Sequence, residues 1–130
     1  PGYPGQVRRT EDGEGWEPDP LVIDERFLAA HVAGKGLVVL SACSHAGIVN
    51  VLIHAQKLFP GVPLHAAVGG LHLSGANESI IPQTIEGLRA FGLARIAAGH
   101  CTGWRAMTAL ANAFGDRVLA PTAVGKRFSF

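Results

Sequence analysis

The feature that most constrains this chain is a threefold alternation between short apolar runs and longer helical segments. The run GLVVLSA, at 36–42, is continuous and rich in branched residues, which is typical of a strand buried on both faces. Loops containing glycine follow, and then apolar residues recur at helical spacing. The predicted strands cover 36–42, 64–70 and 93–99, and the predicted helices cover 47–59, 78–92 and 104–114. This alternation predicts an α/β fold with largely parallel strands.

The two ends of the chain differ from this central region. Residues 1–20 contain four prolines and four glycines, so we expect a loop or arm without any regular element. Residues 21–130 are expected to fold together, either as one compact domain or as part of a larger one. Asp24 is placed to cap a short helix that runs to about His31. After the third helix, we expect a terminal edge hairpin whose short strands are separated at Pro121.

Composition excludes several classes of partner. The 130 residues are 48% hydrophobic, which is enough for a packed core. The net charge of +1 gives no basis for nucleic-acid binding, and no apolar run reaches the roughly 18 residues of a membrane span. A chain that begins with Pro1 rather than Met is expected to be processed, trimmed or cut from a longer protein. The two cysteines lie next to histidines, which favours a reduced, cytoplasmic setting.

A histidine follows each of the three predicted strands. His45, His72 and His100 occur at nearly equal intervals, each at or just past the carboxyl end of its strand. Ligands of open α/β sheets bind outside these strand ends, so the three side chains are expected to point into one crevice. Neutral imidazole is a common metal ligand, and converging histidines suit Zn²⁺ best, or Mn²⁺ and Fe less specifically. Alternatively, each is an ordinary loop histidine that caps backbone groups.

Other residues near this crevice allow more than one interpretation. Cys43 and Cys101 flank it as soft metal ligands, as thiol nucleophiles, or simply as small packed side chains. The chain has three further histidines, to which we assign no role: one near a predicted helix end, one on the polar face of a helix, and one within a strand. They are His31, His54 and His65.

The turns before the helices are candidates for binding an anion. Ser44 and Thr102, together with Gly70 and Gly103, lie in these turns. Backbone N–H groups at helix starts favour anions such as phosphate, so these residues are candidate substrate or anion contacts. In the alternative interpretation, the glycines only allow the chain to turn.

Three segments carry a resemblance to a known family. GLVVLSACSHAGIVN, AVGGLHLSGA and GHCTGWRA resemble the carboxyl-terminal half of metallo-β-lactamase-fold hydrolases, over about residues 36–115. The branch they resemble most is that of the 7,8-dihydropterin-6-methyl-4-(β-D-ribofuranosyl)-aminobenzene-5′-phosphate synthase-like proteins. The resemblance implies half of an αββα sandwich. It also implies metal-dependent hydrolysis, in which activated water attacks an ester or phosphate-bearing small molecule, here of a pterin-related kind.

The resemblance also implies roles for the histidines. By motif position, His45 and His100 bind metal, and His72 assists catalysis. His72 lies where many relatives place a bridging aspartate. Three roles therefore stay open for it: metal ligand, hydrogen-bond donor to the site, or substrate contact. The family's HxHxDH motif occurs nowhere in these 130 residues. We therefore expect an amino-terminal half, from the same gene or another chain, or a homo-oligomer, to complete the site, and the isolated chain to be inactive.

Two other functions fit the same residues. In the first, the half-fold is a non-catalytic dimerising or binding module, and its histidines are vestigial or hold a structural metal. Alternatively it is a proteolytic fragment, inactive on its own, since its Pro/Gly-rich start suits a cut in an exposed loop. The missing HxHxDH motif separates these from the enzyme: without a segment that supplies it, hydrolysis by the family's route fails.

Overall fold

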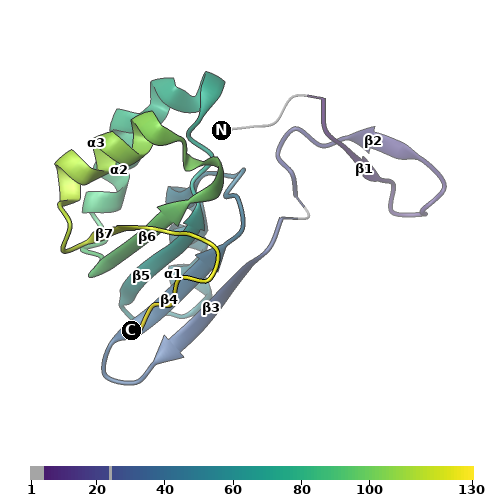
Figure 1. Cartoon of the computed structure of the whole chain (residues 1–130). Coiled ribbons are helices and arrows are strands. Elements are labelled where there is room, and N and C mark those ends of the chain that lie inside the picture. The colour runs from purple at the N-terminus through teal and green to yellow at the C-terminus, as the bar shows by residue number, and fades with distance from the viewer. Residues whose placement is uncertain (1–4, 24) are drawn as a thin grey trace.

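A five-stranded sheet with three α-helices packed against it forms the centre of the molecule (Figure 1). The structure is a computed structural model that describes residues 5–23 and 25–130. The sheet has the order β3-β4-β5-β6-β7. Its strands are β3 (Phe27–Val32), β4 (Gly36–Ser41), β5 (Leu64–Gly70), β6 (Arg95–Gly99) and β7 (Leu119–Pro121). The helices are α1 (Ile48–Leu58), α2 (Ile81–Arg89) and α3 (Trp104–Phe114), with 3₁₀ turns at Gly75–Ile80 and His100–Thr102.

Strands β4 to β7 are parallel and neighbour one another in chain order, while β3 is an antiparallel edge strand. Consecutive parallel strands need crossover connections, and right-handed crossovers place α1, α2 and α3 on the same face of the sheet. One buried apolar cluster fills the space between the helices and that face; Leu37, Leu52, Leu88, Ile96 and Leu110 are fully buried in it. The predicted α/β fold with largely parallel strands is therefore confirmed.

The predicted helix from Asp24 to His31 is wrong. Residues 27–32 form β3, which pairs with β4 through the turn at Ala33–Lys35, where Gly34 has a φ of 72°. In an extended strand this segment gains a full set of hydrogen bonds to β4, whereas its short length gives an isolated helix little stability. Asp24 itself lies outside the described residues.

The expectation of no regular element in residues 1–20 is also wrong. Strands β1 (Val7–Arg9) and β2 (Trp16–Pro18) pair as an antiparallel hairpin that projects away from the sheet as an arm (Figure 1). Gly13 and Gly15 lie in the turn between the two strands, and Pro18 ends β2, so none of these residues interrupts the pairing.

The predicted terminal hairpin is not formed either. Strand β7 pairs with β6 in parallel and ends at Pro121, and the described residues 122–130 contain no further strand. Proline has no N–H with which to continue a ladder, so the strand stops there. Phe130 instead returns to the sheet, where its ring lies 6.4 Å from that of His65 on β5.

The register of the sheet brings three loops together at one edge. Ser41 of β4 pairs with Gly69 of β5, and Gly70 pairs with Gly99 of β6. The loops that leave these strands at their carboxyl ends are therefore neighbours, as the sequence predicted. The longest described helices have 11 residues, and in the described part of the chain none has the length and apolar character of a membrane span.

Candidate functional site

Backbone strain is concentrated in the three loops at this edge. Four non-glycine residues in the described part of the chain have positive φ, and three of them are Ser44 (59°), His72 (49°) and His100 (51°). The left-handed region is sparsely populated by such residues and is typically kept where a site needs a particular side-chain direction. One strained residue in each of three neighbouring loops therefore marks this edge as the candidate site.

His45 is held by a carboxylate from the segment that leads into β3. Glu25 accepts hydrogen bonds from the backbone N–H groups of His45 (3.0 Å) and Ala46 (3.2 Å). Its Oε1 also lies 3.1 Å from Nδ1 of the His45 ring. A carboxylate on one ring nitrogen orients the imidazole and leaves Nε2 for a metal or a substrate, which is the usual arrangement around a metal-binding histidine.

His72 packs directly against His45. The two rings are edge to face with centroids 4.6 Å apart, and Nδ1 of His72 lies 3.7 Å from Cys43 Sγ. Asn77 donates a side-chain hydrogen bond to the carbonyl of His72 (3.1 Å), which supports its strained backbone. Burial lowers the pKa of His72 below its usual 6.5, and the nearby His45 lowers it further. The ring is therefore neutral at pH 7, the state that binds metal or accepts a proton.

Two thiols meet beside His72. Cys43 Sγ and Cys101 Sγ lie 2.8 Å apart although 58 residues separate them in the chain, and both cysteines are free and half-buried. Burial raises the pKa of the Cys43 thiol to about 12, and its hydrogen bond with Cys101 adds to the shift. Donor atoms of Cys43, His72 and Cys101 all lie within 4.8 Å of one another. Two sulfurs and an imidazole are a donor set that suits zinc, so these residues fit a metal ion.

His100, predicted to bind metal, lies in a more open position. It begins the 3₁₀ turn after β6 and is exposed to solvent. The cluster of close donors found among the described residues contains His72 but neither His45 nor His100. The structure thus brings His45 and His72 into contact, whereas the metal-binding roles of His45 and His100 stay predictions.

The predicted anion-binding residues are largely engaged within the protein. Ser44 is fully buried and donates to Ser41 Oγ (2.9 Å). Thr102, also fully buried, donates to the carbonyl of Gly99 (2.6 Å) and accepts from the N–H of Leu71 (3.1 Å). These two hydroxyls therefore position the loops.

The two glycines of this set allow close approaches between loops. A Cβ on Gly70 would lie 2.8 Å from Cys101 Sγ. Gly103, with φ of 78°, precedes α3, and a Cβ there would lie 2.9 Å from that of Ser74. The backbone N–H groups at the start of α3 are still the kind of group that favours an anion. The role of all four residues in substrate binding stays a prediction.

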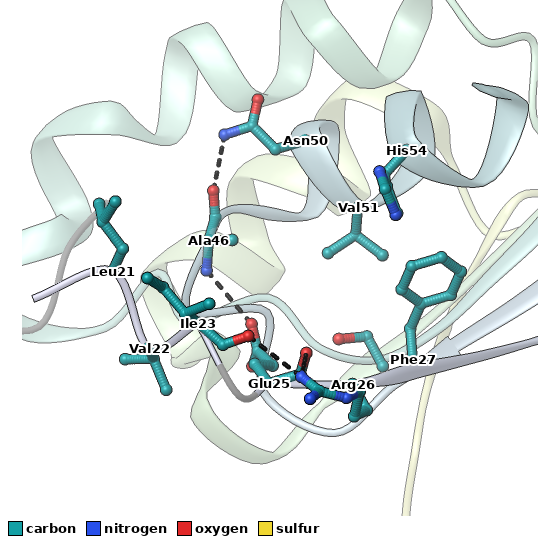
Figure 2. A pocket seen from close by; sticks show the side chains of 11 residues that line it. Leu21, Val22, Ile23, Glu25, Arg26, Phe27, Ala46, Asn50, Val51 and His54 are labelled. Atoms are coloured by element: carbon teal, nitrogen blue, oxygen red, sulfur yellow. Dashed lines mark hydrogen bonds between the residues drawn. The ribbon is translucent and has the colours of Figure 1, made fainter. Parts of the chain in front are cut away.

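A cavity of about 310 Å³ lies next to the His45 loop, between the segment 21–27 and α1. Figure 2 shows Glu25 reaching Ala46, whose carbonyl in turn accepts a hydrogen bond from Asn50 of α1 (2.6 Å). Most of the other residues that line the cavity are apolar: Leu21, Val22, Ile23, Phe27 and Val51. The carboxylate that holds His45 therefore also forms part of the cavity wall.

Among the described residues, Glu25 is a residue of the candidate site that the sequence did not indicate. It lies in no recognisable motif, 20 residues before its partner His45. The hairpin register would have located it: Phe27 pairs with Ser41, so residues just before β3 lie opposite those just after β4. The expectation of a helix at 24–31 hid this relation.

The fold and these motifs can be compared with known proteins. A solved metal-dependent hydrolase of the β-lactamase superfamily matches 97% of this chain and 49% of its own, with a TM-score of 0.79 and 27% identity. The chain has the fold of half a β-lactamase-superfamily hydrolase. The resemblance read from the motifs is confirmed, and this fold in turn suggests a metal cofactor. No family model matches the chain.

Two curated relatives, both from Methanocaldococcus jannaschii, match shorter stretches. The chain is 37% identical over 84 residues to 7,8-dihydropterin-6-methyl-4-(β-D-ribofuranosyl)-aminobenzene-5′-phosphate synthase, covering 65% of this chain and 29% of that enzyme. It is 33% identical over 89 residues to an uncharacterised protein, covering 68% of this chain and 31% of that protein. The chain thus spans about a third of the length of each curated relative.

Proposed function

We propose that this chain is the carboxyl-terminal part of a metal-dependent hydrolase that acts on an ester or phosphate-bearing small molecule. The observation that carries the proposal is the Glu25–His45–His72 arrangement, located at the carboxyl edge of a sheet with this fold. The amino-terminal part of the fold, with its HxHxDH motif, would complete the site from the same gene or from a second chain. The reduced thiols fit a cytoplasmic location.

In this proposal His45 and His100 hold the metal, with Zn²⁺ as the ion that suits imidazole donors best. A bound divalent ion would supply Lewis acidity and lower the pKa of a water molecule toward 7. Glu25 fixes the ring of His45, so that Nε2 faces the site in one orientation. His72, neutral at pH 7 because of its lowered pKa, is placed to hold or accept a proton beside His45.

The substrate is proposed to carry a phosphate or carboxylate near the start of α3. The N–H groups after Gly103 point out of the helix end and favour an anion. The similarity to an enzyme named for a pterin with a ribosyl phosphate supports a pterin-related substrate. In this proposal the largely apolar cavity beside Glu25 receives the flat ring system of that substrate.

The test is metal analysis combined with native mass spectrometry on the protein that contains this chain together with its amino-terminal half. His45→Ala and His100→Ala should each lower the bound metal well below one ion per site and abolish hydrolysis. His31→Ala is the matched control, because His31 lies exposed on the edge strand β3. Full metal occupancy with normal turnover in either site variant would remove the assignment.

His72→Ala separates the roles left open for His72. Reduced turnover with metal retained would make it a proton-transfer or substrate residue, whereas equal loss of metal would make it a ligand. The competing proposal is a non-catalytic module. A metal-free homodimer of the chain, with no segment supplying HxHxDH, would favour that module over the hydrolase.

A further inference from the structure

We propose that Cys43 and Cys101 are a site of reversible oxidation, where an intramolecular disulfide links the loops after β4 and β6. The two sulfurs lie 2.8 Å apart in the free thiol state. A disulfide bond is about 2.0 Å long, so the sulfurs need to move together by less than about 1 Å. Both side chains are half-buried rather than enclosed, so a small oxidant can reach them.

The strand between the two loops leaves space for this pair. Gly70 of β5 lies beneath both cysteines, and a Cβ there would stand 2.8 Å from Cys101 Sγ and 3.2 Å from Cys43 Cα. Its φ is not in the left-handed region, so backbone conformation does not explain the glycine. The close approach of Cys101 Sγ, of the Cys43 backbone and of the Ala42 carbonyl, 2.7 Å from the same Cβ position, does explain it.

The position of the pair gives the oxidation a consequence. Cys43 lies two residues before His45, and Cys101 directly follows His100. A disulfide would fix the two loops that carry these histidines relative to each other. It would also remove the S–H group of Cys43, whose Sγ now lies 3.7 Å from His72 Nδ1. The bond itself is independent of the proposed function, whereas its effect on hydrolysis rests on that function.

The same thiols allow a competing role as metal ligands with His72. Two thiolates bound to one tetrahedral zinc, at Zn–S distances near 2.3 Å, are about 3.8 Å apart. The observed 2.8 Å separation would have to widen by about 1 Å, and it is nearer to the bonded distance. The geometry therefore favours oxidation, and metal binding by the pair is one outcome of the test.

The proposed step is thiol–disulfide exchange with a small-molecule disulfide such as oxidised glutathione. Because burial raises the pKa of Cys43 to about 12, Cys101 is the first nucleophile: its sulfur attacks the reagent, whose S–S bond breaks and releases one small thiol. Cys43 then attacks the mixed disulfide on Cys101 and passes its proton to the departing thiolate. This step forms the Cys43–Cys101 bond and releases the second small thiol. The two thiol protons end on the released thiols, and two electrons reduce the reagent. A dithiol reductant reverses the reaction.

The experiment treats the fully reduced, metal-free chain with oxidised glutathione and follows intact mass and cysteine-containing peptides. We expect the loss of two hydrogen atoms from the chain, a single peptide pair joining Cys43 to Cys101, and complete reversal by dithiothreitol. Cys43→Ser and Cys101→Ser should each give only a mixed disulfide with glutathione. The mass change, the joined peptides and their reversal by dithiothreitol are all measured on the unmodified chain. The test therefore still decides the proposal if a cysteine variant fails to fold.

Three results would overturn the proposal. They are two separate glutathione adducts on one chain, thiols that stay reduced in excess oxidant, and disulfides that join two chains. Cobalt binding by the reduced chain, with intense sulfur-to-cobalt absorption but no bridge on oxidation, would instead assign the pair to a metal. These readouts concern thiols alone, so a failed bridge is distinguishable from a failed hydrolase assignment, which His45→Ala and His100→Ala test by metal content.

Discussion

Replacement of Glu25 by alanine is the perturbation that most directly tests the architecture of the site. The Glu25 side chain is 12% exposed and that of His45 is 25% exposed, so water replaces the lost carboxylate only in part. Leaving a partly buried N–H without its charged acceptor costs about 1–3 kcal/mol. The second N–H, on the exposed Ala46, regains water and adds little. We therefore expect Glu25→Ala to lower the free energy of unfolding by about 2 kcal/mol.

Urea unfolding followed by circular dichroism measures this change. In thermal unfolding of the same variant, a loss of about 2 kcal/mol lowers the melting temperature by roughly 6–10 °C in a domain of this size. Glu86→Ala is the control, because Glu86 is 77% exposed and pairs with Arg89 on the surface of α2. Its expected cost is below about 0.5 kcal/mol. Glu25→Gln keeps the shape and one acceptor oxygen, so it should recover part of the stability.

The same variant tests the proposed function through metal affinity. Removal of the group that orients a metal-binding histidine typically weakens metal binding about 10–100-fold. Competition with a chromophoric chelator, on the protein completed by its amino-terminal half, measures that affinity. A Glu25→Ala variant as stable as Glu86→Ala would refute the structural argument. Unchanged metal affinity in a destabilised variant would refute only the role of His45.

Three further predictions concern pH and backbone. Because the pKa of His72 is lowered below 6.5 in the folded protein, the unfolded chain binds the His72 proton more tightly. The free energy of unfolding, measured by urea titrations at a series of pH values, should therefore fall as the pH drops below about 6.5. The fall should be smaller in His72→Gln. Because burial raises the pKa of Cys43 from 9.0 to about 12, stability should fall as pH rises above 9, and Cys43→Ser should flatten that slope. Gly69→Ala places a Cβ 1.7 Å from the Ser41 carbonyl at φ of +130° and should prevent stable folding. Gly92→Ala, at φ of +60° with open space around it, should cost only about 1 kcal/mol in the same unfolding assay.

The strands β4 and β5 and the helix α3 were predictable almost to the residue because each is a strong local pattern. A continuous apolar run such as 36–41 has few other ways to be buried, and α3 has a clear apolar face. The segment 27–32 was misjudged because its state depends on a partner. Its six residues become a strand only through hydrogen bonds to β4, which no pattern within the segment records.

The candidate site was predictable in position but not in its contacts. Strand order alone places His45, His72 and the two cysteines at one edge of the sheet. Whether imidazole meets imidazole or thiol depends on turns of a few residues, where φ values of about 50–60° at Ser44, His72 and His100 set the direction of each side chain. Positive φ values are favoured for glycine, so a serine or histidine at these positions gives no sign in the sequence that the backbone is left-handed there.

The strained loops keep their shape because neighbouring elements hold them through polar bonds. Glu25 ties the segment before β3 to the loop after β4, and Thr102 ties the loop after β6 to Leu71, directly after β5. Each bond joins different loops, so loosening one loop changes the surroundings of the donors in the next. Substitutions at Glu25 and Thr102 should therefore be non-additive in their effect on the site, as is usual for residues within one network. Additive effects would mean that each loop keeps its conformation through its own backbone. The contact between His45 and His72 would then result from the packing of separate loops and would not couple them.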